Sequence, residues 1–394
     1  MSRPGRAVQP DAAAHRATDG GRTSSRPLGP GLWIRPERIK ELSLAGVLVV
    51  TALLFSLLVD DYLTGRFFNR VTTSVAITAV LAVAQSLVIL TRNIDLSVGS
   101  IVGVTAYVTG EHLVDHPDTP AVQAVGMAML IGGGLGLVNG ILVAYGKVPA
   151  IVVTLGTLAI YRSWLIEHAD GQTITTDSLP GWVVDFPQRT VFGVGDLDLR
   201  GVFAITLALV VVLQLALGRL RWGRRLYAIG SNPEAAAQSG LPQQRLVLSA
   251  FAGCGALSGL AGFLFLSRFG TITVVAGQGL ELDSVAAAVV GGVSILGGAG
   301  TLVGALLGAL LINLLDLSLV RVEQVSEFWR NAILGTLILA AVVGDVALGR
   351  WFRRRLSIEG RPTRAITGSV TRSVAQSRDG SGHRTTEPAG AHDA

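Results

Sequence analysis

Residues 121–145 read AVQAVGMAMLIGGGLGLVNGILVAY, an apolar run without a charged side chain. A helix of roughly 17 to 25 apolar residues can cross the hydrocarbon core of a bilayer. Gly132, Gly136 and Gly140 recur in it at four-residue intervals and would form a flat helix face, which another backbone can approach closely. The stretch therefore predicts a membrane-spanning helix that packs tightly against a neighbour.

Runs of this kind recur along the whole chain. Of its 394 residues, 50% are hydrophobic, only 15% are charged and 49 are glycines, which is typical of membrane proteins and not of globular ones. We therefore predict an all-α fold, a polytopic membrane helix bundle of about ten transmembrane helices. The candidate spans are 42–58, 73–91, 94–110, 121–145, 148–166, 202–218, 246–266, 284–298, 301–319 and 331–349. Polar or glycine residues interrupt 94–110, 148–166 and 284–298, so these three can be broken or re-entrant.

The distribution of basic residues predicts the orientation of the bundle. Eight Lys and Arg residues precede the first span, five lie in the connection 219–246 and nine follow from Arg350 onward. The connection 111–120 contains none. Because cytoplasmic loops carry the excess of Lys and Arg, we expect both termini in the cytoplasm. The net charge of +5 then needs no nucleic-acid partner.

The chain divides into three parts. Residues 1–40 and 351–394 are rich in small, polar and basic residues, and we expect two disordered cytoplasmic tails around a transmembrane domain at 41–350. The single cysteine, Cys254, excludes an intramolecular disulfide and a cysteine-clustered metal site.

A second glycine series indicates an internal duplication. Gly300, Gly304 and Gly308 repeat the spacing of the first series. Asp95 precedes the first series and Asp283 the second, while the tetrapeptide LGTL follows them at 155–158 and 334–337. Two five-span halves around a central transport route would explain this pattern. Tight helix packing without duplication is the alternative.

A short polar segment separates two of the apolar runs. Residues 223–240 read GRRLYAIGSNPEAAAQSG. Asn232 is a good N-cap, Pro233 and Glu234 suit a first helical turn, and Gly240 provides a stop. About two turns of helix are marginal alone in water, so the membrane domain or a partner must hold them. The alternative is a capped loop helix without a partner.

Polar side chains at span positions are candidates for a substrate route. Asp95 stands at the start of a span, where an ionisable group is costly and often functional, although Asp is also a favoured helix cap. For the others, hydrogen bonding between helices is the alternative. The candidate route residues are Asn93, Asp95, Ser97, Asn139, Thr154, Thr157, Tyr161, Glu281, Asp283 and Asn313.

Several classes of enzyme motif are absent from the sequence. Gly146-Lys147 is followed by Val148-Pro149, which cannot form a phosphate-binding loop. Neither a His-Glu-x-x-His pair nor a Gly-x-Ser-x-Gly elbow occurs. We therefore predict no catalytic residue, no metal and no cofactor in this chain.

Four collinear motifs resemble one family. They are IDLSVGS at 94–100, VPAIVVTLGT at 148–157, GRRLYAIGSN at 223–232, and ELDSVAA at 281–287, which continues as GGVSILGG at 291–298. Together they make residues 40–350 similar to the permease subunits of bacterial ATP-binding-cassette importers for simple sugars, the ribose, xylose, rhamnose and autoinducer-2 group. Residues 89–93 and Asp316 look more like the autoinducer-2 and rhamnose branches than the ribose branch.

This resemblance implies partner proteins and a location in the cell. ATPase subunits that bind ATP and Mg would contact the segment 230–240 in the cytoplasm. A sugar-binding protein would dock outside on loops that include 167–200, and a second permease copy or a related permease would complete the pore in the lipid of the bacterial plasma membrane. The residues implied in ATPase coupling are Arg224, Arg225, Gly230, Asn232, Pro233, Glu234, Ala235 and Gly240.

The sequence is also compatible with three alternative functions. A permease for branched-chain amino acids or nucleosides would share the architecture. An ion-coupled secondary carrier would need a network of carboxylates at the membrane centre. The sequence gives little support for such a network. A purely structural membrane protein would leave the capped cytoplasmic helix unexplained.

Overall fold

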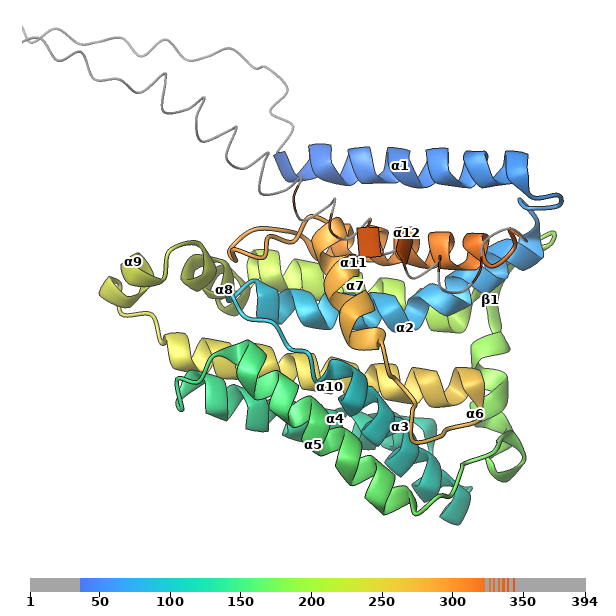
Figure 1. Cartoon of the computed structure of the whole chain (residues 1–394), viewed down its shortest axis with the longest axis horizontal. Coiled ribbons are helices and arrows are strands. Elements are labelled where there is room, and N and C mark those ends of the chain that lie inside the picture. The colour runs from blue at the N-terminus through green and yellow to red at the C-terminus, as the bar shows by residue number, and fades with distance from the viewer. Residues whose placement is uncertain are drawn as a thin grey trace, which may run out of the picture.

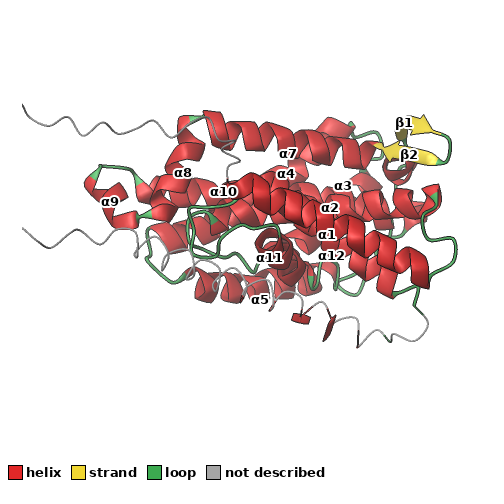
Figure 2. Cartoon of the chain, turned by 90° about the horizontal axis from the view of Figure 1, so that it is seen from above, coloured by secondary structure: helices red, strands yellow, loops and turns green. Residues whose placement is uncertain are grey.

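The computed structural model describes residues 36–322 and scattered residues between 326 and 343. The described chain is almost entirely helical, with one small β-hairpin (Figures 1 and 2). The elements are α1 (Pro36–Leu58), α2 (Gly65–Ile89), α3 (Val98–Asp115), α4 (Ala121–Ala144), α5 (Ala150–Ala169), η1 (Thr176–Ser178), α6 (Gly181–Asp185), η2 (Phe186–Gln188), β1 (Thr190–Val194), β2 (Leu197–Arg200), α7 (Gly201–Arg219), α8 (Arg221–Ser231), α9 (Pro233–Gln238), α10 (Gln243–Phe269), α11 (Leu280–Val290) and α12 (Leu302–Leu319). The predicted tails at 1–40 and 351–394 lie outside the described residues except for 36–40, and so do the span 331–349 and the second LGTL tetrapeptide, apart from isolated positions.

The predicted membrane helix bundle is confirmed, whereas the count of ten spans is not. Within the described residues, seven helices are long and apolar enough to cross a membrane: α1, α2, α4, α5, α7, α10 and α12. The predicted span 148–166 is the continuous helix α5. The other two interrupted runs are broken, because residues 90–97 are largely extended or in turns before α3, and 284–298 divides into the short α11 and a loop.

Two helices form the centre of the bundle. α2 is the most buried of the seven candidate spans and α10 is largely buried as well, because other helices surround both. α10 packs against α3 and α4, and α2 packs against α11 and α12. α1 lies at the edge of the bundle, where Phe55 and Tyr62 pack with Phe67 and Leu314 against the end of α12 (Figure 1). The remaining long helices bury one face and expose an apolar one, as helices in lipid do.

Both glycine series are sites of close helix contact, as predicted. Gly132 and Gly136 lie directly against α10, where a Cβ at Gly136 would collide with the carbonyl oxygen of Phe251. Gly304 and Gly308 lie in the same way against the end of α11. Gly300 differs from the prediction, because it precedes α12 in a loop with a φ of 128°, a conformation that favours glycine.

The arrangement of these helices is that of an inverted repeat. α2, α3 and α4 correspond in order to α10, α11 and α12, and each central helix packs against the other half's partners. α2 runs from the β-hairpin, where Asn69 bonds Asp198, to a junction with α8, where the carbonyl of Leu90 bonds Gly298. α10 runs the opposite way, from Gln243 beside α9 to Gly270 beside Thr176. Two halves of opposite direction are typical of transporters.

One end of the bundle carries a structure that the all-α prediction missed. Residues 170–200 form short helices and the antiparallel pair β1 and β2, with Val194 opposite Leu197 across a turn that contains Gly195 at a φ of 61°. A bridge between Ile174 and Ile272 ties this segment to the chain after α10. It lies at the end of the bundle opposite α9 (Figures 1 and 2).

Candidate functional site

The polar segment between α7 and α10 folds as an elbow of two helices. α8 buries Gly223, Leu226, Ile229 and Gly230, which recur every three or four residues on one face. Arg224 and Arg225, on the other face, are exposed. α8 is a helix that was not predicted, although the apolar spacing at 223, 226, 229 and 230 is a signal for it in the sequence.

α9 has the start and stop that the sequence predicts. The Oδ1 atom of Asn232 accepts a hydrogen bond from the backbone N–H of Ala235 at 3.0 Å, Pro233 is the first helical residue, and Gly240 follows the helix with a φ of 70°. Of the helix side chains only Ala236 is buried, so Glu234 and Ala235 are open to a partner. The helix projects from the end of the bundle (Figure 1).

The elbow is fastened to both halves of the repeat. Gly230 packs directly on the carbonyl of Leu90 and on Gly298. Tyr227 donates a hydrogen bond to the carbonyl of Gly300 at 2.8 Å, and the N–H of Gly298 donates to the carbonyl of Leu90 at 3.0 Å. The connections that precede α3 and α12 therefore meet at the end of α8.

Arg92, which is not among the predicted site residues, contacts the end of α8 at this junction. Its Nε donates to the carbonyl of Gly230 at 2.5 Å and its Nη2 to the carbonyl of Ser231 at 2.9 Å. These carbonyls lie at the negative end of the α8 dipole, which favours a cation. Arg92 itself has a φ of 67°, a left-handed backbone conformation that is costly for a residue other than glycine. We name Arg92, Gly230, Ser231 and Gly298 the elbow junction.

Three residues beyond Arg92, the chain enters a buried polar cluster around Asp95. The Asp95 carboxylate accepts hydrogen bonds from the N–H and Oγ of Ser97 at 2.9 and 2.7 Å, and from Nδ2 of Asn139 at 3.4 Å. The side-chain amide of Gln85, oriented to satisfy both its groups, pairs with the backbone N–H and C=O of Asp95 at 3.0 and 3.1 Å. Asp95 thus ties the connection 90–97 to α2 and α4.

Three further predicted route residues lie beside this cluster on the buried face of α5. Thr154 donates to the carbonyl of Ile94 at 3.4 Å, and Tyr161 donates to the carbonyl of Leu135 on α4 at 3.0 Å. Thr157, on the same face, bonds back to its own helix at Val153. The structure therefore brings six of the ten candidate route residues together: Asp95, Ser97, Asn139, Thr154, Thr157 and Tyr161.

The other four candidates lie elsewhere. The Nδ2 of Asn93 donates to Thr91 in the first connection, and Nδ2 of Asn313 donates to the carbonyl of Ala309 within α12. Glu281 and Asp283 lie in the first turn of α11, where Glu281 accepts from the N–H of Gly279 at 3.2 Å. Within the described part of the chain, no group of three or more His, Cys, Asp or Glu side chains is placed to hold a metal ion.

Known proteins are similar to this sequence over most of its length. A family model described as the permease component of the branched-chain amino acid transport system matches residues 67–342. The chain belongs to this family of transport permeases, so it is a multi-pass transport component and not an enzyme. The resemblance to importer permeases that the motifs predict is thereby confirmed.

Individual relatives carry a more specific name. An "Autoinducer 2 import system permease protein LsrC" from Yersinia enterocolitica is 35% identical over 303 residues, which cover 77% of this chain and 81% of the relative. The protein of the same name from Yersinia pestis strain Pestoides F is also 35% identical, over 77% of this chain and 83% of its own length. No solved structure matches the chain.

Proposed function

We propose that this chain is the membrane permease subunit of an ATP-binding-cassette importer and that it moves a sugar-like molecule into the bacterial cytoplasm. The observation that carries the proposal is the exposed α9 helix, which projects from the bundle yet is joined through α8 to both halves of an inverted repeat. Such a helix is suited to receive a partner's movement and to pass it to both halves.

Autoinducer-2 is the favoured substrate, with rhamnose next and ribose or xylose possible. The relatives named above as autoinducer-2 permeases support this choice. The family description favours a second candidate function, the import of branched-chain amino acids. The two candidates differ in substrate and share the architecture.

The partners follow from the two ends of the bundle. Cytoplasmic ATPase subunits, which hold ATP and Mg, bind α9 and the exposed Arg224 and Arg225. A sugar-binding protein docks at the opposite end, on loops that include 167–200. The hydrogen bond between Thr301 and Glu41, near the start of α1, places the N-terminal end of α1 at the α8 end of the bundle, which supports a cytoplasmic N-terminus. We propose the cytoplasm for the C-terminus as well, and a second permease copy or a related permease as the other half of the pore.

Transport then requires two packing arrangements of the half-repeats, with ATP supplying the bias between them. In the arrangement described here, Asp95, Ser97 and Asn139 are completely buried. We propose that the six clustered route residues become accessible to substrate when the connection 90–97 moves with the elbow junction. Their polar groups can then exchange partners with the hydroxyls of a sugar.

The function is tested by uptake into vesicles that contain this chain with its ATPase and binding protein. We expect ATP-dependent uptake of labelled autoinducer-2, and none of labelled leucine, when ATP is inside and every ion gradient has been removed. Uptake of leucine instead would select the branched-chain amino acid importer. Uptake that persists without the ATPase and vanishes with an ion gradient would replace the proposal by a secondary carrier.

Replacement of Gly240 tests the role of α9 as a lever. A β-branched residue is strained at a φ of 70°, by about 1–2 kcal/mol, although no atom lies within 4 Å of the position. We expect Gly240→Val to shift the end of α9, to lower ATP-driven uptake by about tenfold, and to leave membrane insertion and ATP hydrolysis intact. Gly240→Asn is the matched control, because Asn tolerates this conformation. Normal uptake by Gly240→Val would exclude the lever role.

A further inference from the structure

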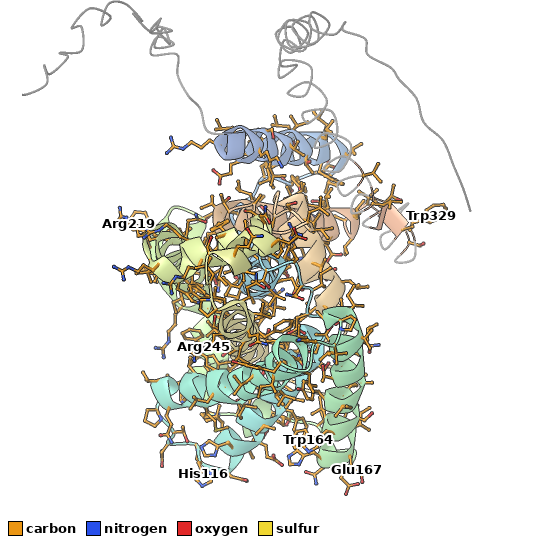
Figure 3. All side chains as sticks on the ribbon, turned by 90° about the vertical axis from the view of Figure 1, so that its left-hand side faces the viewer. His116, Trp164, Glu167, Arg219, Arg245 and Trp329 are labelled. Atoms are coloured by element: carbon orange, nitrogen blue, oxygen red, sulfur yellow. The ribbon has the colours of Figure 1, made fainter. Side chains whose placement is uncertain are left out.

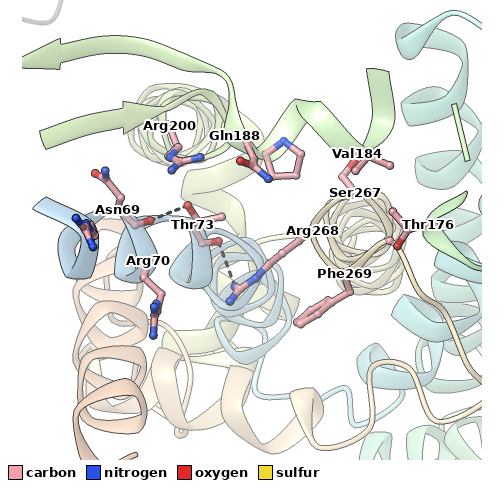
Figure 4. Close-up of a pocket in the computed structure, with 13 residues that line it drawn as sticks. Asn69, Arg70, Thr73, Thr176, Val184, Gln188, Arg200, Ser267, Arg268 and Phe269 are labelled. Atoms are coloured by element: carbon pink, nitrogen blue, oxygen red, sulfur yellow. Dashed lines mark hydrogen bonds between the residues drawn. The ribbon is translucent and has the colours of Figure 1, made fainter. Parts of the chain in front are cut away.

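A cavity of about 530 Å³ opens at the end of the bundle away from α9. It lies between the start of α2, the end of α10 and the segment 176–200. Four arginines line it, Arg66, Arg70, Arg200 and Arg268, and none of the lining residues is acidic. Figure 4 shows Arg200 and Arg268 on either side of Thr73. The described walls of the cavity are therefore strongly cationic.

Two polar atoms of this wall lack a hydrogen-bond partner among the described residues. They are Oγ of Ser267, a residue that is 2% exposed, and Nε of Arg200. A buried polar group left unpaired costs about 1–3 kcal/mol, and native proteins pair almost all such groups. Both atoms belong to side chains that can donate a hydrogen bond. Because both atoms are themselves buried, a ligand in the cavity would reach them only if the side chain turned toward it.

Two of the four arginines have acidic neighbours, because Arg66 and Arg70 also line an adjoining pocket with Asp61 and Asp196, whereas Arg200 and Arg268 do not line that pocket. Arg268 donates through Nη1 to the carbonyl of Thr73 at 3.3 Å, which is a neutral partner. Asp198, which follows the turn of the hairpin, is outside the cavity wall and bonds through its Oδ2 and N–H to Asn69. The ligand that this wall fits is thus an anion with several acceptor oxygens.

We propose that the cavity binds a phosphate group, held by Arg200, Arg268 and Ser267. The planar fork of a guanidinium matches the oxygens of a phosphate, and these charge-assisted hydrogen bonds are among the strongest in proteins. The cavity lies at the ends of the candidate spans α2 and α10, the depth at which lipid phosphates lie. The half-exposed ring of Phe269 gives its wall an apolar part. The phosphate belongs either to a lipid headgroup or to free inorganic phosphate.

Thermal unfolding of the full chain in detergent tests the site with inorganic phosphate as the probe. At constant ionic strength we expect phosphate to raise the midpoint in a saturable way. Arg200→Gln and Arg268→Gln should each weaken the apparent affinity for phosphate by about tenfold, the loss expected for a charge-assisted hydrogen bond. Arg245→Gln is the control, because Arg245 is exposed near the α8 end (Figure 3).

Ser267→Ala separates ligand binding from a merely structural role. The Oγ atom of Ser267 has no partner in the described protein, so we expect its removal to leave the phosphate-free midpoint at or above the wild-type value. The same variant should show a smaller phosphate-induced shift. A structural role would predict a lower midpoint without phosphate and an unchanged shift, which would contradict the proposal. Ser267→Ala also keeps the test decisive if an arginine variant fails to fold.

Nanodiscs distinguish the two sources of phosphate. Native mass spectrometry measures which lipid the protein retains. A lipid headgroup is identified if the wild type retains phosphatidylglycerol in preference to uncharged diglyceride and if Arg200→Gln and Arg268→Gln lose this preference. A saturable shift with inorganic phosphate in detergent, without that selectivity, would identify free phosphate. If neither depends on these arginines, the proposal is wrong. It is equally wrong if the variants weaken only capture of the purified sugar-binding protein, because the arginines would then belong to its docking surface.

Discussion

Gly136→Leu is expected to prevent the stable assembly of the bundle. A Cβ at this position would overlap the carbonyl oxygen of Phe251 and the backbone of Gly255, and backbone atoms cannot rotate away as a side chain does. α4 and α10 would have to separate along a contact in which the glycines of both helices meet. Overpacking of a close-packed interior typically costs about 1–3 kcal/mol, and we expect more than about 3 kcal/mol here because two helix backbones must move.

Fluorescence-detected size-exclusion chromatography of the full chain measures this effect. We expect the monodisperse peak of wild type to be lost in Gly136→Leu. Gly134→Leu is the matched control, since Gly134 lies two residues away on the same helix, is exposed and has no atom within 4 Å of its added Cβ. A monodisperse Gly136→Leu protein of wild-type stability would show that the two helices do not need this close contact.

Arg92→Gln is expected to abolish most ATP-driven uptake while the protein remains inserted. The guanidinium makes two hydrogen bonds to the carbonyls at the end of α8, and glutamine can replace neither the charge nor the fork. A coupling free energy of about 1–3 kcal/mol between α9 and the bundle corresponds to about 5- to 150-fold in the bias between the two packing states. We therefore expect uptake by reconstituted vesicles to fall at least about tenfold, with ATP hydrolysis by the bound ATPase retained.

Arg219→Gln is the control for this variant, because it removes a positive charge from an exposed residue at the same end of the bundle (Figure 3). Its uptake should match wild type. If Arg92→Gln transports normally, the elbow junction does not pass movement through Arg92. If ATP hydrolysis and ATPase binding are lost together with uptake, Arg92 acts in assembly and not in coupling.

The elbow shows how far local sequence signals reach. Asn232, Pro233 and Gly240 act within a few residues of one another, so their cap, first turn and stop could be predicted and are present. The junction that holds the elbow could not be predicted, because Arg92 and Gly230 are 138 residues apart and meet only because α7 and α10, the long helices before and after α8, both pack against α2. For the same reason the sequence could not show which candidate route residues lie together. Asn139 bonds Asp95 in the buried cluster, whereas Asn313 bonds the carbonyl of Ala309 within its own helix.

The sequence by itself determined the class of fold and the family of this protein. Apolar length, glycine spacing and four local motifs depend only on residues close in the chain, and bilayer thickness and backbone hydrogen bonding then leave helices as the outcome. The tertiary structure alone decided which apolar runs break, where the polar groups find partners and which end gathers Arg200 and Arg268 around a cavity. Those features depend on contacts between different helices and connections: 44 positions separate Asp95 from Asn139 and 68 separate Arg200 from Arg268, and no local pattern in the sequence predicts either contact.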